Sequence, residues 1–181
     1  MCRTISVIVI ALILSVPALQ AHAGAPDPAK TILDAALRDA GASHRTVFLI
    51  FHASWCSWCR KLDAVLESPD VKSLIARDYV VVRLDVLERG DKIGTLENPG
   101  GREIMTRLGG EKSGLPFYAF LEGSGKKIAD SMIEGPGMET IGYPGNEEEI
   151  ALFGKLLKKT SHRLTDEDRA VVLNKFRKQG T

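Results

Sequence analysis

The side chains with the clearest chemistry are two cysteines in the segment Trp55-Cys56-Ser57-Trp58-Cys59. Only two residues separate them, and the apolar run from Val47 to Phe51 comes shortly before. This order predicts that a buried strand ends and a helix begins near the first cysteine. Unpaired N–H groups at a helix start stabilise a thiolate, and a thiol one turn later can form a disulfide with it. The spacing therefore predicts a redox centre.

In such a centre we expect Cys56 to be the nucleophile and Cys59 the resolving thiol. Cys56, at the exposed helix start, attacks a substrate disulfide, and the more buried Cys59 then releases the product from the mixed disulfide. Trp55, Ser57 and Trp58 are predicted to line the groove where a substrate docks. In an alternative arrangement, Trp55 packs against the sheet and only Trp58 is exposed.

Other uses of a close cysteine pair fit the sequence less well. A zinc site needs four ligands, and His52 with the two cysteines supplies only three. A c-type haem needs His directly after the second cysteine, where Arg60 stands. A structural disulfide closing so short a loop would stabilise little. We therefore expect no metal and no separable cofactor, with a redox-inert or metal-binding module as the alternative function.

The first residues have the pattern of an export signal. Arg3 precedes an apolar run from Ile5 to Leu14, and Ala21-His22-Ala23 follows. A basic start, a short apolar core and an Ala-x-Ala exit are typical of secretory signal peptides. The run is also shorter than the ~20 residues that a membrane-spanning helix needs. We expect residues 1–23 to be removed, leaving one periplasmic or secreted domain over 24–181; an uncleaved anchor is the alternative.

Composition excludes several classes of protein. The chain has 24 Lys and Arg against 23 Asp and Glu, so no basic excess indicates nucleic-acid binding. Of its three cysteines, Cys2 belongs to the predicted signal, and the remaining pair is too small for a disulfide scaffold. The composition is that of an ordinary soluble domain, which we expect to be a monomer.

Hydrophobic spacing predicts helices that alternate with strands. Strands separated by helices favour an α/β fold, with a central mixed sheet and helices on both faces. The polar stretch 88–101 is predicted to be a long loop that sets specificity. In chain order, the predicted elements are helix 28–40 ended by Gly41, strand 46–51, a helix from 57 interrupted at Pro69, strand 79–84, helix 102–108, hairpin strands 116–121 and 126–132, a helix capped by Asn146, and helix 165–178.

Four segments together carry a resemblance to a known family: Phe51-His52-Ala53-Ser54-Trp55-Cys56-Ser57-Trp58-Cys59-Arg60-Lys61, the strand ending at Asp85, Gly114-Leu115-Pro116-Phe117 and Gly125-Lys126. On these residues, the stretch from Val47 to Ile133 resembles the thioredoxin superfamily. It is most similar to exported members, including the C-terminal domain of the thiol:disulfide interchange protein DsbD. The resemblance implies a thioredoxin-like fold with a core of about residues 45–160 and a C-terminal helical extension over 161–181, interpreted as cladding.

The resemblance also implies roles and partners. Pro116 matches a cis proline that faces the cysteines, and Leu115 matches the residue whose backbone pairs with a bound peptide. The implied activity is that of an exported thiol:disulfide oxidoreductase. Its partners would be cysteine-containing exported proteins and a redox partner in the envelope or membrane.

One departure from the family concerns proton transfer. Ile50 stands where thioredoxin has a buried acid, and His52 replaces a large aromatic residue. Strand alternation places both side chains on one sheet face, so His52 is a candidate proton relay; the alternative is that it only fills space. The pair Ser57-Trp58 also differs from that of thioredoxin, which leaves the direction of electron flow open.

Overall fold

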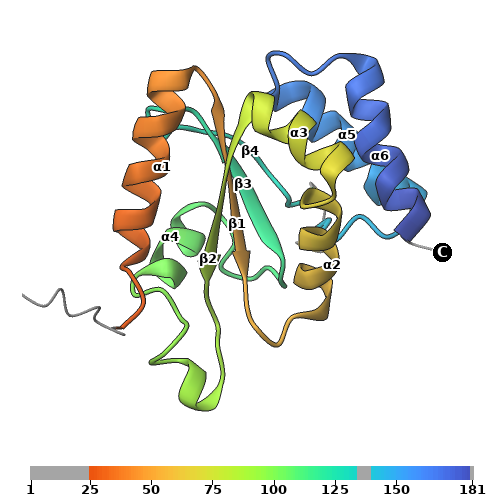
Figure 1. Cartoon of the computed structure of the whole chain (residues 1–181). Helices are drawn as coiled ribbons and strands as arrows, with labels where there is room; N and C mark the ends of the chain where they lie inside the picture. The colour runs from red at the N-terminus through yellow and green to blue at the C-terminus, as the bar shows by residue number, and fades with distance from the viewer. Residues whose placement is uncertain (1–24, 134–139, 180–181) are drawn as a thin grey trace, which may run out of the picture.

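The computed structural model describes residues 25–133 and 140–179. Helices cover both faces of a four-stranded sheet, as the α/β prediction required (Figure 1). The strands are β1 (Thr46–His52), β2 (Tyr79–Asp85), β3 (Phe117–Leu121) and β4 (Lys127–Asp130). The helices are α1 (Ala29–Ser43), α2 (Ser57–Leu66), α3 (Pro69–Asp78), α4 (Gly101–Arg107), α5 (Glu147–Thr160) and α6 (Asp166–Gln179), with a 3-10 turn η1 (Gly90–Lys92).

The predicted signal peptide, residues 1–23, lies outside the described residues. Within residues 25–133 and 140–179, no helix has the length and apolar character needed to cross a membrane.

The sheet has the order β2-β1-β3-β4. β1 runs parallel to β2 and antiparallel to β3, which in turn is antiparallel to β4. His52 at the end of β1 is therefore opposite Asp85 at the end of β2, and Phe51 is opposite Phe117 at the start of β3. This register gathers the redox segment, Asp85 and the Leu115–Pro116 loop at one edge of the sheet.

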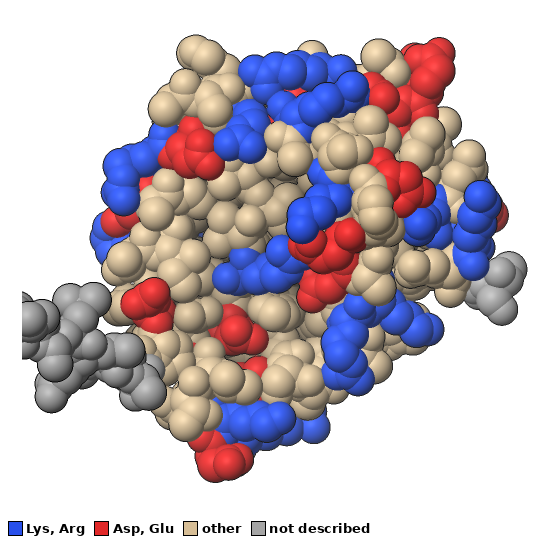
Figure 2. Space-filling view, in the orientation of Figure 1, with Lys and Arg blue, Asp and Glu red and all other residues tan. Residues whose placement is uncertain are grey.

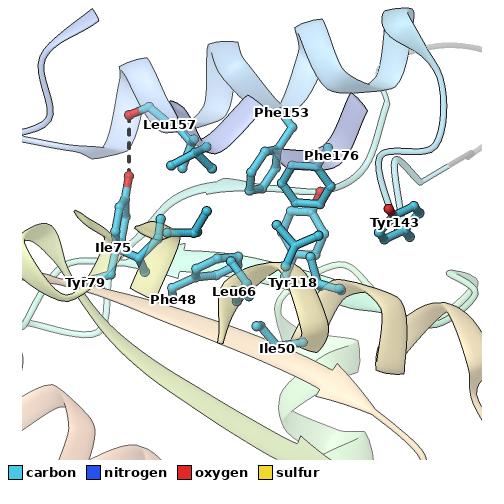
Figure 3. Close-up of a cluster of buried hydrophobic side chains, with 14 of the residues drawn as sticks. Phe48, Ile50, Leu66, Ile75, Tyr79, Tyr118, Tyr143, Phe153, Leu157 and Phe176 are labelled. Atoms are coloured by element: carbon cyan, nitrogen blue, oxygen red, sulfur yellow. Dashed lines mark hydrogen bonds between the residues drawn. The ribbon is translucent and has the colours of Figure 1, made fainter. Parts of the chain in front are cut away.

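Alternation along β1 divides its side chains between two hydrophobic cores. Val47, Leu49 and Phe51 belong to a core shared with α1 and α4. Phe48 and Ile50 face α2, α3, α5 and α6 on the other side, in an aromatic cluster (Figure 3). The ring centroids of Phe48 and Phe120 in this cluster are 4.5 Å apart. Because both faces are covered, β1 reads as a continuous apolar run.

Two predicted boundaries differ from the structure by more than one residue. α1 continues past Gly41 to Ser43, and His44, with a φ of 52°, ends it. Gly123 allows the turn after β3 to approach α1 closely at Gly41, since a Cβ atom on Gly123 would lie 2.6 Å from the Gly41 Cα. β4 stops at Asp130, short of the predicted residue 132, because the Asp130 carboxylate accepts the Met132 N–H at 2.9 Å.

The C-terminal helix does more than cover the core. Phe176 of α6 is fully buried, with its ring centroid 5.2 Å from that of Phe153. The turn before α6 is fixed by Asp78, a fully buried carboxylate at the end of α3. This carboxylate accepts N–H groups from three consecutive residues at 2.7–3.0 Å, namely His162, Arg163 and Leu164.

We predict that Asp78→Ala lowers the free energy of unfolding by at least about 2 kcal/mol, because each buried N–H left without an acceptor costs about 1–3 kcal/mol. Urea denaturation of the oxidised protein measures this change. Asp34→Ala is the control, since Asp34 makes only an exposed ion pair with Lys30, worth about 0–1 kcal/mol. Equal effects of the two substitutions would contradict the role assigned to Asp78.

Candidate active site

The redox segment forms the connection between β1 and α2. The Cys56 N–H donates to the Ala53 carbonyl at 3.0 Å, which closes a turn after β1. Cys56 is the N-cap of α2, and its Sγ accepts the Cys59 N–H at 3.1 Å. Cys56 and Cys59 form a disulfide, with their Cα atoms 5.3 Å apart. The sulfur of Cys56 thus lies where the partial positive charge of the helix start acts on it.

Both cysteines are covered in the disulfide form. Cys56 is 3% exposed and Cys59 is 2% exposed, and Ala53 and Leu115 pack with them. This differs from the prediction of an exposed Cys56 above a buried Cys59. The burial of Cys56 could not be predicted from its neighbours in the sequence, because Leu115 reaches the cysteines from a distant loop.

The Leu115–Pro116 peptide bond is cis. Pro116 is buried, and Leu115 contacts the two cysteines, so the fold brings this predicted groove segment to the disulfide. Gly142, with a φ of 55°, approaches the same place, since a Cβ atom there would lie 3.9 Å from the Pro116 carbonyl oxygen. The chain after β4 therefore borders the groove.

Trp58 forms one wall of a hollow beside the disulfide. It is 51% exposed, and its ring stacks on that of Tyr143 with centroids 5.7 Å apart. The hollow has a volume of about 440 Å³. Its lining residues are Trp58, Leu115, Thr140, Ile141, Gly142, Tyr143, Gly145, Asn146 and Glu149. Sequence analysis assigned no role to Tyr143, although an aromatic residue among the glycines and prolines before Asn146 is a usable signal.

Trp55 is held on the other side of the redox segment. It is 39% exposed, so it does not pack into the sheet as the alternative arrangement required. Its indole N–H donates to the Leu87 carbonyl at 2.8 Å, and the Arg89 guanidinium lies 3.9 Å from its ring centroid. Ser57, between the tryptophans, is exposed at the first position of α2.

A buried carboxylate ties the loop after β2 to the residues before the cysteines. Glu88 is 5% exposed and accepts the Ser54 N–H at 2.5 Å and the Ser54 hydroxyl at 2.8 Å. The Lys92 ammonium donates to the same hydroxyl at 3.1 Å. Sequence analysis expected this loop to set specificity, whereas its contacts also fix the turn that presents Cys56. Glu88 carries no motif, so it was missed.

His52 lies beside a carboxylate at the sheet edge. Its Nε2 is 3.4 Å from Oδ1 of Asp85, which is opposite it on β2. Burial raises the pKa of Asp85, with the nearby charges of Glu88 and Asp63 acting in the same direction and His52 opposing them. Ile50 faces the aromatic core. The Asp85 carboxylate on the neighbouring strand thus lies near His52, at the end of the strand that leads to the cysteines.

No group of three or more His, Cys, Asp or Glu side chains suited to hold a metal ion occurs within residues 25–133 and 140–179.

We predict that Glu88 affects both stability and thiol reactivity. Glu88→Ala should lower the free energy of unfolding by about 1 kcal/mol or more, because it leaves the part-buried Ser54 N–H and hydroxyl without their acceptor. Glu88→Gln keeps an acceptor but removes a negative charge near Cys56, so iodoacetamide should alkylate the reduced variant severalfold faster at pH 6. Glu103→Gln, on the exposed surface of α4, is the control. An unchanged alkylation rate in Glu88→Gln would refute the electrostatic part.

Known proteins resemble this arrangement. Residues 29–123 match a family model described as Thioredoxin-like. A curated relative, the thiol:disulfide interchange protein DsbD of Photorhabdus laumondii, is 30% identical over 94 residues, which are 51% of this chain and 14% of that protein. The similarity to DsbD expected from the sequence is thereby confirmed. The chain spans only that small share of the relative's length.

Two solved structures are also similar. The disulphide isomerase of Xylella fastidiosa Temecula1 is 27% identical with a TM-score of 0.47, and the match covers 56% of this chain and 72% of that chain. The oxidised C-terminal domain of DsbD from Neisseria meningitidis is 22% identical with a TM-score of 0.42, and the match covers 58% and 84%. The family match spans more than half of the chain and includes the disulfide and Pro116. The chain therefore belongs to the thioredoxin-like family.

Proposed function

We propose that this protein is an exported thiol:disulfide oxidoreductase that exchanges disulfides with cysteine-containing proteins. The observation that carries the proposal is the Cys56–Cys59 disulfide at the start of α2, with Leu115 packed against it. A close pair at a helix start is an arrangement in which one sulfur is activated and the other can displace it.

In the reducing direction, the Cys56 thiolate attacks one sulfur of a substrate disulfide, and the other substrate sulfur leaves as a thiolate. The helix start and the Cys59 N–H stabilise negative charge on Cys56. Cys59 then loses its proton and attacks the Cys56 sulfur, which displaces the second substrate thiolate. Two electrons have passed to the substrate, and the Cys56–Cys59 disulfide is formed. The oxidising direction is the same sequence reversed.

We further propose that the protein acts outside the cytoplasm as a monomer, after removal of residues 1–23. The basic start, short apolar run and Ala21-His22-Ala23 support this location. A redox partner in the envelope or membrane then restores the disulfide or dithiol after each turnover. Trp55, Ser57, Trp58, Leu115 and Pro116 border the groove that the substrate enters.

His52 is proposed to pass the proton that Cys59 loses. The pairing of His52 with Asp85 supports this role, because a carboxylate orients an imidazole and stabilises its protonated form. Ile50, at the position of the family's buried acid, has no ionisable group. His52 is thus the ionisable side chain of β1 at this edge.

We predict that Cys59→Ser accumulates mixed disulfides through Cys56, because nothing resolves them. Incubation with oxidised insulin, followed by mass spectrometry without reductant, should show the covalent adduct. Cys56→Ser is the matched control and should form no such adduct. If Cys59→Ser traps nothing while remaining folded, the oxidoreductase proposal fails and the redox-inert alternative is favoured.

We predict that His52→Phe slows insulin-disulfide reduction and changes its pH profile, because a phenyl ring cannot pass the proton that Cys59 loses. Asp85→Asn should produce part of the same change, since Asp85 contacts the His52 imidazole and helps to orient it. The exposed His162, replaced by Gln, serves as the control. Superimposable profiles of wild type and folded His52→Phe would leave His52 with a packing role only.

A further inference from the structure

Four cationic side chains surround the redox segment, and within residues 25–133 and 140–179 none of them forms a salt bridge with a carboxylate. All four are exposed. We call them the basic rim. Its members are Arg60, Lys61, Arg89 and Lys92.

Two members of the rim lie over the tryptophans. The Lys61 ammonium is 4.4 Å from the ring centroid of Trp58, and the Arg89 guanidinium is 3.9 Å from that of Trp55. Such cation–π contacts hold a charge in place without neutralising it. The field of each cation therefore stays available to a molecule that approaches the disulfide.

The other two members contact Ser54, just before the cysteines. Arg60 donates to the Ser54 carbonyl at 3.0 Å, and Lys92 donates to the Ser54 hydroxyl at 3.1 Å. Both partners are uncharged oxygens. By contrast, Arg83 and Lys175, away from the redox segment, pair with carboxylates at 2.6 and 3.0 Å.

Nearby carboxylates do not cancel the rim at the surface. Glu88 is buried against Ser54, and Asp85 lies beside His52. Two further carboxylates are half-buried and accept backbone N–H groups: Glu97 accepts that of Glu88 at 2.9 Å, and Glu149, beside Trp58, accepts that of Gly145 at 2.8 Å.

Asp91 on η1 is an exposed acid within the loop after β2. On the face drawn in Figure 2, basic and acidic side chains alternate over most of the molecule, consistent with a net charge of only +1. Among the described residues around the redox segment, the four exposed cations of the basic rim therefore share the surface with one exposed carboxylate, Asp91.

Exposed apolar side chains occupy the same region. Among the described residues, the large exposed hydrophobic side chains include one on α6, Val171. The remaining four are on the redox segment or on the loop after β2, whose Lys92 touches Ser54: Trp55, Trp58, Ile93 and Leu96. An apolar centre with a charged surround is the composition of a protein-binding surface.

We propose that this surface docks a protein segment in which Asp or Glu side chains, together with apolar residues, flank the reactive cysteine pair. The inference rests on the oxidoreductase function proposed above and names the chemistry of its partner. Opposite charges raise the rate of encounter and select among partners, and salt weakens both effects. The exposed apolar residues supply the contact area once the partner has arrived.

Three synthetic peptides test the proposal. Each contains the same intramolecular disulfide and the same apolar residues, and they differ only in flanking residues that are Asp, Lys or Ser. The fully reduced protein is mixed with each peptide, and the second-order rate constant is followed by tryptophan fluorescence. Each value is divided by the rate constant of the same peptide with dithiothreitol, which removes differences in intrinsic disulfide reactivity.

We expect the Asp peptide to exceed the Lys peptide by at least about tenfold at low salt, within the range of electrostatic steering. The ratio should fall towards unity at about 1 M salt, where the Debye length is about 3 Å. The double variant Lys61→Gln, Arg89→Gln should lose most of the preference. Lys158→Gln, Lys159→Gln, two exposed changes at the end of α5, should keep it.

Equal normalised rates for the Asp and Lys peptides at low salt would overturn the proposed partner chemistry, while reduction of all three peptides would leave the oxidoreductase function standing. If the double variant Lys61→Gln, Arg89→Gln still reduces the Asp peptide faster than the Lys peptide by the wild-type ratio, the proposed partner chemistry is also overturned, because another surface would then be responsible. If no peptide is reduced, the proposed function itself fails.

Discussion

The burial of β1 on both faces is the constraint on which the rest of the structure depends. Its side chains belong alternately to the two hydrophobic cores, so the strand cannot slip by one residue without reversing every contact. The register in turn sets where β1 ends, opposite Asp85 on β2 and next to the start of β3. The turn that follows places Cys56 at the N-cap of α2 and Cys59 one turn later. Packing in the middle of the sheet therefore fixes the positions of Cys56 and Cys59 at its edge.

Two loops complete the site from opposite sides of the redox segment. The loop after β2 holds Ser54 through Glu88 and holds Trp55 through the Leu87 carbonyl. The chain after β4 brings Tyr143 against Trp58. Both loops act on the backbone or the aromatic neighbours of the cysteines and leave the sulfurs to Leu115. The cysteines can consequently exchange bonds while their surroundings keep a fixed shape, which is the condition for a preorganised site.

Sequence reasoning succeeded where the information is local. The apolar run of β1, the spacing of Cys56 and Cys59, and the Asn146 cap, which accepts the Glu149 N–H at 2.9 Å, each follow from neighbouring residues. It failed where a side chain acts across the chain. Glu88 meets Ser54, and Asp78 meets the turn before α6, through contacts that no local pattern encodes. The burial of Cys56 was missed for the same reason, since Leu115 comes from another loop. The C-terminal helix was predicted to be cladding because few of its residues are apolar, yet Phe176 is fully buried in the core.

The most direct test of the redox account is an equilibrium titration of Cys56 and Cys59 against glutathione. The fraction of disulfide is measured by mass spectrometry after acid quenching, at oxidised-to-reduced glutathione ratios that span the range between thioredoxin, about −270 mV, and DsbA, about −120 mV. The account predicts one reversible two-electron transition, about 30 mV per tenfold change in the equilibrium constant, that Cys56→Ser abolishes. A midpoint near the first value indicates a reductant, and one near the second an oxidant. A pair that stays fully oxidised or fully reduced at every ratio, or that changes irreversibly, would contradict the account.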